Sequence, residues 1–96
     1  MKAPRVDLNH KAIVDALKQC GCSVLSLAAI GKGAPDLLVG LRGENVLLEL
    51  KHKAGKLNPQ QVAWHAQWRG QSATARTVEE ALAVLGLTRD ERQCYK

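Results

Sequence analysis

Aromatic residues are scarce in this sequence, which has two Trp, one Tyr and no Phe among its 96 residues. Leu, Val, Ile and Ala must therefore fill the hydrophobic core. The sequence also lacks a membrane-length apolar run and a recognisable signal segment. We therefore expect a cytoplasmic protein that neither crosses a membrane nor is secreted.

Cysteine occurs at only three positions, 20, 22 and 94. An odd number cannot form a complete disulfide set, and the spacing differs from the paired CxxC knuckles that bind zinc. Reduced thiols are the state that we expect for such cysteines in the cytoplasm.

Acidic residues are outnumbered: nine Asp and Glu face fourteen Lys and Arg, so the net charge is +5 and the pI is near 9.4. This balance favours a polyanionic partner such as nucleic acid, although a solvated basic surface has the same composition. The length suits one small domain, which we expect to span residues 1–96.

Apolar periodicity and turn residues predict seven elements in the order α-β-β-β-α-β-α, followed by a polar, frayed tail from residue 88. Strands that alternate with helices predict an α/β protein with helices layered on a sheet. Asn9 or Asp7 is expected to cap the first helix, and Thr77 with Glu80 the last. The expected ranges are 9–20, 22–29, 36–41, 45–51, 58–70, 72–78 and 77–86.

Two acidic residues and a lysine interrupt the apolar hairpin predicted over residues 36–51. A turn near 42–44 brings Asp36 beside Glu49 when the strands pair antiparallel. Glu49 and Lys51 are two residues apart in a strand, so their side chains leave on one face, and Leu50 leaves on the other. The hairpin therefore gathers two carboxylates and an ammonium group.

Adjacent buried carboxylates are costly unless they are paired, hydrogen-bonded or bound to a metal. Mg²⁺ binds oxygen ligands, and Asp36 and Glu49 with the backbone carbonyl of Leu50 are candidate ligands. Such an ion promotes phosphodiester hydrolysis, with Lys51 orienting the nucleophile or steadying the phosphate. The alternative is an exposed Glu49–Lys51 ion pair, with Asp36 merely following a proline in a turn.

The order of these residues, "PD" at 35–36 and "ELK" at 49–51, resembles the PD-(D/E)xK nuclease signature. The wider string over 31–70, with "DLNHKAIVDALKQCG" before it and "TVEEALAVLG" after it, resembles the VRR-NUC family, especially its small stand-alone phage and bacterial members. This resemblance implies a restriction-endonuclease-like core with a central mixed β-sheet flanked by helices. It also implies Mg²⁺ or Mn²⁺ dependence, and homodimers acting on branched DNA such as Holliday junctions.

The resemblance extends to individual residues. Asp36, Glu49 and Lys51 match the family's metal and catalytic positions, and Gln61 matches a Gln at the start of its second helix. Family members often carry a Glu on the first helix, where this sequence aligns Ala12. Asp15 lies about one turn away and is a candidate to compensate through water.

Basic residues bracket the acidic pair, and we expect them to contact DNA phosphates. They are Lys32, Arg42, Lys53 and Lys56. His65 is left outside the site because a lone helical histidine is more often structural. Trp64 and Trp68, four residues apart, are expected in the core or in a dimer contact.

Two functions remain open at this point. One is a structure-selective DNA endonuclease of the Holliday-junction resolvase type. The other is a non-catalytic DNA-binding module with a degenerate metal site, which the alanine at position 12 makes possible.

Overall fold

The structure, a computed structural model, describes residues 4–52, 55–89 and 94–95, and side chains within 9–52 and 55–88. The predicted order α-β-β-β-α-β-α is confirmed up to α3. The helices are α1 (Pro4–Gln19), α2 (Pro59–Gln67) and α3 (Val78–Val84); the strands are β1 (Ser23–Ser26), β2 (Leu37–Leu41), β3 (Glu44–Leu50), β4 (Ser72–Ala75), β5 (Thr88–Arg89) and β6 (Cys94–Tyr95).

The first four strands form one mixed sheet in the order β1-β2-β3-β4. β1 pairs antiparallel with β2, and β2 pairs antiparallel with β3, whereas β3 and β4 run parallel. A parallel pair needs a crossover connection, and the segment that contains α2 supplies it. The predicted hairpin is confirmed as β2 and β3, and these two strands occupy the middle of the sheet.

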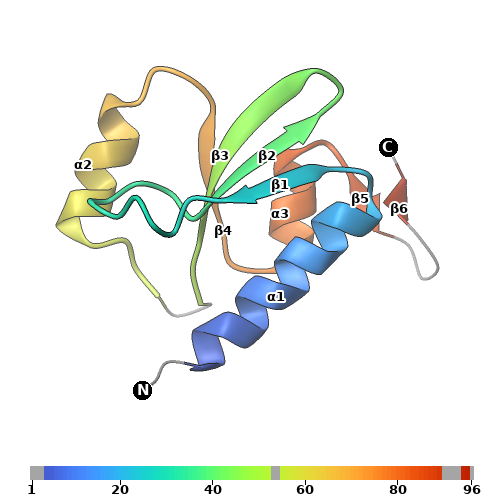
Figure 1. The fold of residues 1–96 in the computed structure, drawn as a ribbon, viewed down its shortest axis with the longest axis horizontal. Coiled ribbons are helices and arrows are strands. Elements are labelled where there is room, and N and C mark those ends of the chain that lie inside the picture. Colours follow the sequence, from blue (N-terminus) through green and yellow to red (C-terminus); the bar gives the residue numbers. More distant parts are fainter. Residues whose placement is uncertain (1–3, 53–54, 90–93, 96) are drawn as a thin grey trace.

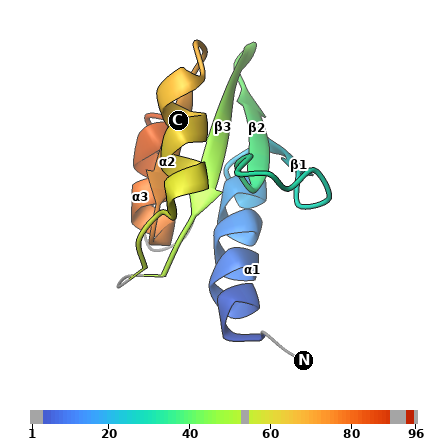
Figure 2. The same cartoon turned by 90° about the vertical axis from the view of Figure 1, so that its left-hand side faces the viewer.

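The helices lie on both sides of the sheet, with α1 and α3 on one side and α2 on the other (Figure 1 and Figure 2). The core fills the space between the sheet and the α1–α3 layer. Ile13 and Leu17 from α1 and Leu82 from α3 are fully buried there, against Leu48 of β3. Burial of one such side chain contributes roughly 1.5–3 kcal/mol.

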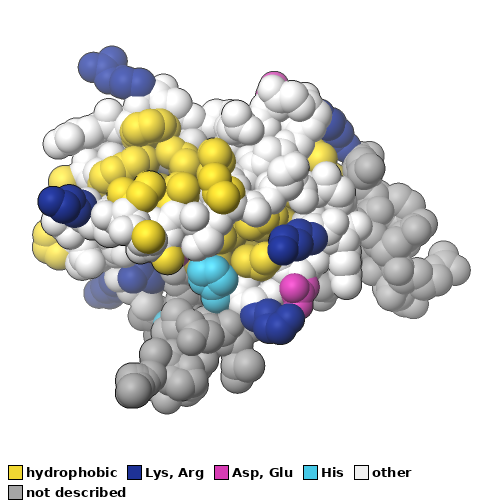
Figure 3. Space-filling model, viewed as in Figure 1, with side chains coloured by type: hydrophobic (Ala, Val, Ile, Leu, Met, Phe, Trp, Pro, Cys, Tyr) yellow, Lys and Arg dark blue, Asp and Glu magenta, His cyan; other side chains and the backbone are white. Residues whose placement is uncertain are grey.

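No residue of α2 is buried. Val62 and Trp68 are 53% and 47% exposed, and the indole of Trp68 stacks on that of Trp64 with ring centroids 4.8 Å apart. Hydrophobic side chains gather on the face of the molecule that includes α2 (Figure 3). The two tryptophans are thus not part of the described core, which leaves the dimer contact as a prediction.

Three expectations are wrong: the cap of the first helix, the frayed tail and the reduced state of Cys20. α1 begins at Pro4, so Asp7 and Asn9 lie inside the helix instead of capping it, and Asn9 Nδ2 donates to the carbonyls of Lys51 and Arg76, 3.4 Å away in each case. The tail is not simply frayed, because β5 pairs with β6. Cys20 is disulfide-bonded instead of reduced. The spacing of the cysteines in the sequence could not predict this bond, because tertiary folding brings the two sulfur atoms together.

Only one of the two hydrogen bonds of the capping box predicted for α3 is formed. The Glu80 N–H donates to Thr77 Oγ1 at 3.0 Å, but the Glu80 carboxylate accepts from the Arg76 N–H instead of that of Thr77.

Within the described ranges, no helix has the length and apolar character needed to span a bilayer.

Candidate active site

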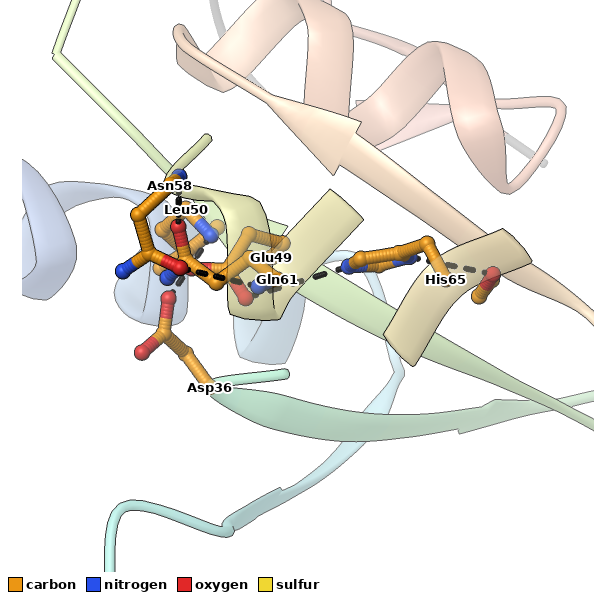
Figure 4. A network of polar contacts seen from close by, with 7 residues as sticks. Asp36, Glu49, Leu50, Asn58, Gln61 and His65 are labelled. Carbon is orange, nitrogen blue, oxygen red and sulfur yellow. Dashed lines mark hydrogen bonds and ion pairs between the residues drawn. The ribbon is translucent and has the colours of Figure 1, made fainter. Parts of the chain in front are cut away.

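The β2–β3 register brings the two acidic residues together. Leu37 lies opposite Leu48, and the same register continued by one residue places Asp36 opposite Glu49. The Leu50 N–H donates to Asp36 Oδ2 at 2.8 Å, so the backbone of β3 holds the carboxylate of Asp36 in place (Figure 4). The pairing predicted from the turn position is therefore correct.

Glu49 is the buried charged residue of the described core, with 2% of its surface exposed. Its neighbours along β3, Leu48 and Leu50, face the α1–α3 layer, so by alternation Glu49 faces α2. There, Gln61 Nε2 donates to Glu49 Oε2 at 3.0 Å. Glu49 Oε1 is buried and has no hydrogen-bond partner among the described residues.

The N-terminus of α2 fixes the orientation of Gln61. Asn58 caps the helix by accepting from the Gln61 N–H at 2.8 Å, and the Asn58 N–H donates back to Gln61 Oε1 at 2.9 Å. This reciprocal pair is a capping box. Because its amide oxygen is engaged with Asn58, Gln61 presents its NH₂ group to Glu49.

Burial raises the pKa of Glu49 from its ordinary value of 4.5 to about 7. Loss of solvation is the largest cause; the charge of Asp36 and a hydrogen bond between the two carboxyl groups raise the pKa further, and the charge of Lys51 lowers it in part. The pair of carboxyl groups therefore holds on to a proton close to neutral pH, which a cation would displace.

A pocket of about 180 Å³ opens at this position. It unites the four residues that the sequence nominated as catalytic with two residues of α1. The lining comprises Asn9, His10, Asp36, Glu49, Leu50, Lys51, His52 and Gln61. The sequence could have indicated Asn9 and His10 as pocket residues, because both lie within one helical turn of Ala12, the position where the family resemblance leads us to expect Glu.

A solved structure described as "VRR_NUC domain" is similar to this one. It aligns with a TM-score of 0.70 and 25% sequence identity over 88% of this chain and 97% of that chain. The chain has the VRR_NUC fold. No family model matches the sequence, and no curated protein matches it.

Two positions on α1 that bear on the metal site, Ala12 and Asp15, lie outside the pocket. Asp15 is exposed on α1 and pairs with Lys11 at 2.8 Å, and Ala12 is exposed as well. Neither Asp15 nor Ala12 lines the pocket. The part of α1 that faces the carboxylates carries an amide and an imidazole at this point, and compensation by Asp15 through water stays a prediction.

The four basic candidates are spread along the chain. Lys32 is exposed in the β1–β2 loop and Lys56 is exposed just before α2. Arg42 occupies the β2–β3 turn, at the opposite end of the hairpin from Asp36, and lines a different pocket. Lys53 lies outside the described residues. Lys56 precedes the start of α2 by three residues, and Lys32 neighbours Gly33, which lies against Gln60 of α2.

His65 is a further residue beside the site that the sequence interpretation missed. It lies four residues after Gln61, on the same face of α2, and its Nε2 is 3.9 Å from Glu49 Oε1 (Figure 4). Its Nδ1 is 3.2 Å from Ser72 Oγ on β4. The spacing from Gln61 was the available signal, but it has meaning only once α2 is known to lie over Glu49.

The donor set of this pocket fits a divalent cation. Asp36 and Glu49 are adjacent hard oxygen ligands, and one oxygen of Glu49 is buried without a partner among the described residues. The raised pKa of Glu49 reflects first its loss of solvation and then the charge of Asp36, and a bound cation relieves both. Within the described residues, no group of three or more His, Cys, Asp or Glu is placed to hold a metal ion. The protein thus offers two carboxylates, the minimum that Mg²⁺ typically uses together with substrate phosphate.

Proposed function

We propose that this protein is a metal-dependent endonuclease that hydrolyses phosphodiester bonds in DNA. The VRR_NUC fold is that of a nuclease-type domain. The observation that supports catalysis most directly is the buried Glu49, held beside Asp36 by the strand register and lining one pocket with Lys51 and Gln61. Ionising both members of such a buried carboxylate pair is costly, and a bound cation lowers that cost.

In the proposed reaction, Asp36 and Glu49 would hold the cation, with the Leu50 carbonyl as a further ligand. Mg²⁺ or Mn²⁺ bound there would supply Lewis-acid chemistry for hydrolysis of the phosphodiester. The Leu50 N–H fixes the Asp36 carboxylate, and Gln61 fixes that of Glu49. These contacts keep the ligands in place before substrate arrives, which lowers the cost of reorganisation.

Lys51 has the role of binding the scissile phosphate or orienting the nucleophile. It follows Glu49 by two residues, lines the same pocket and is close enough to lower the pKa of Glu49 in part. Its backbone is also well anchored: the Lys51 N–H donates to Ala75 O at 3.0 Å. An ammonium group so placed stabilises negative charge in the transition state.

Branched DNA, such as a four-way junction, is the proposed substrate, and the active form is a homodimer. Twofold symmetry suits a symmetric junction, because each copy then cuts one of two opposed strands. Two exposed apolar residues, Val62 on α2 and Trp68 at its C-cap, support pairing with a second copy. Lys32, Arg42, Lys53 and Lys56 are the proposed phosphate contacts.

A second candidate is a DNA-binding module that does not cleave. Two observations favour it. The described residues contain no three-ligand metal cluster, and position 12 on α1 carries an exposed alanine, where the family resemblance leads us to expect Glu. In this case DNA binding persists and no divalent ion produces strand cleavage.

The test uses labelled four-way-junction, splayed-arm and linear duplex DNA with Mg²⁺, Mn²⁺ or EDTA. The Lys51→Ala variant is compared with Lys18→Ala, which removes an exposed lysine from α1 outside the pocket. We expect metal-dependent paired cuts at the junction, lost only in Lys51→Ala, with DNA binding retained. Binding without cleavage under every metal supports the binding module, and cleavage that survives in the double variant Asp36→Ala, Lys51→Ala contradicts the assigned site.

A further inference from the structure

Two buried polar atoms face each other across the α2–β3 contact without a hydrogen bond. His65 Nε2 and Glu49 Oε1 are both inaccessible to solvent, both lack a partner among the described residues, and are 3.9 Å apart. The side chains of His65 and Glu49 are 15% and 3% exposed. Buried polar groups are rarely left unpaired, and a hydrogen bond requires the two atoms to approach by about 1 Å.

The Ser72 hydroxyl is close enough to His65 to influence which ring nitrogen carries the proton. The Ser72 hydroxyl lies 3.2 Å from Nδ1 and is able to donate to it, in which case the ring proton is on Nε2. Nε2 then points its N–H at Glu49 Oε1. The register of β4 with β3 supports this arrangement. Ser72 lies opposite Leu47 and Thr74 lies opposite Glu49. Leu47 and Glu49 are two residues apart and share one face of the sheet, so Ser72 lies on the same face as Glu49.

Gln61 and His65 are therefore matched donors on one helix face. Gln61 already donates to Glu49 Oε2, and His65 is aimed at the other oxygen from one turn further along α2. An ionised carboxylate accepts about four hydrogen bonds, so each oxygen keeps a free lone pair after accepting one. Both donors can thus hold Glu49 while it binds a cation.

We propose that His65, oriented by Ser72, is a positioning residue that donates to Glu49 Oε1 and holds this carboxylate in its cation-binding orientation. The proposal rests on the proposed function, because it assigns a supporting donor to that same site. Hydrogen-bonded partners of a metal-binding carboxylate typically contribute roughly 10- to 100-fold in metal affinity or activity. His65 acts through Glu49 and contacts neither substrate nor the reacting phosphate in this scheme.

The test measures Mn²⁺ binding to the full chain without DNA by titration calorimetry, alongside kcat and KM for junction DNA. His65→Leu removes the donor, and His65→Gln restores an N–H group at the position of Nε2. Ser72→Ala removes the group that orients the ring. Gln67→Leu makes the same kind of apolar replacement at an exposed position of α2.

We expect His65→Leu to weaken Mn²⁺ binding by roughly 10-fold or more and to lower kcat at unchanged KM. His65→Gln should recover most of this loss, Ser72→Ala should lose less than His65→Leu, and Gln67→Leu should match the unchanged protein. Thermal unfolding of each variant separates this effect from a loss of folded protein, because a merely structural role lowers the unfolding temperature without changing Mn²⁺ affinity.

The inference is overturned if His65→Leu binds Mn²⁺ as the unchanged protein does, or if His65→Gln is as impaired as His65→Leu. Asp36→Ala distinguishes this failure from failure of the proposed function. Loss of Mn²⁺ binding in Asp36→Ala, with His65→Leu unaffected, removes only the role of His65. Unchanged binding in both variants removes the cation site itself and the inference with it.

Discussion

Replacing Glu49 by Gln should remove a pH-dependent penalty on folding. The Glu49 side chain is 3% exposed, and burial next to Asp36 raises its pKa from 4.5 to about 7. The unfolded chain releases this proton near pH 4.5, whereas the folded protein keeps it until about pH 7. Between these values the unfolded state binds fewer protons, so the free energy of unfolding falls as pH rises.

The magnitude follows from the size of the pKa change. Each tenfold change in proton affinity corresponds to about 1.4 kcal/mol, so a rise from 4.5 to about 7 corresponds to a stability loss of roughly 3 kcal/mol. The contribution of the protonated side chain is fully present below pH 4.5 and is lost once the pH has passed about 7. The glutamine introduced by Glu49→Gln stays neutral at every pH, so the variant should lack this loss.

Urea unfolding in EDTA, followed by circular dichroism from pH 4.5 to 8, measures the effect. The difference in free energy of unfolding between Glu49→Gln and the unchanged protein should grow by roughly 3 kcal/mol over this range. Glu44→Gln, at the exposed start of β3, is the matched control and should show no such trend. A difference that stays constant with pH would refute the burial and charge repulsion that we assign to Glu49.

Adding Mn²⁺ at pH 8 extends the same experiment. A cation that binds the folded state alone stabilises it by about 2.7 kcal/mol at 100 times its dissociation constant. The unchanged protein should gain this stability and Glu49→Gln should gain much less, because the variant has lost a charged ligand. Equal gains in both proteins would place the cation somewhere other than at Glu49.

Three further changes test other parts of the structure. Asn58→Ala removes the α2 cap and should cost about 1 kcal/mol in urea unfolding, with a larger relative loss of cleavage because Gln61 loses its anchor. Gly33→Ala should lower the unfolding temperature more than Gly43→Ala: both have positive φ, but only at Gly33 would the new Cβ lie 2.8 Å from the Gln60 carbonyl oxygen. Val62→Asp should convert a dimer into monomers in light scattering; an unchanged mass would exclude this face of α2 as the contact.

The hairpin could be derived from the sequence because its determinants are local. A turn of Arg42 and Gly43 between two apolar runs specifies which residues pair, and strand alternation specifies which side chains share a face. These two rules place Asp36 beside Glu49 and send Glu49 to the face opposite Leu48. The order of elements follows from equally local signals, such as Pro59 after Asn58 at the start of α2.

Tertiary structure alone decided what surrounds Glu49. The direction in which α2 crosses the sheet determines that Gln61 and His65 both face this carboxylate, and no local pattern encodes that direction. The packing of α1 likewise decides the role of Asn9. Instead of capping the helix, Asn9 donates to the carbonyls of Lys51 and Arg76, the residues that follow β3 and β4. Periodicity depends on neighbours a few residues away, whereas helix docking and the raised pKa of Glu49 depend on many contacts between distant segments, which form only when the whole sheet and its helices assemble.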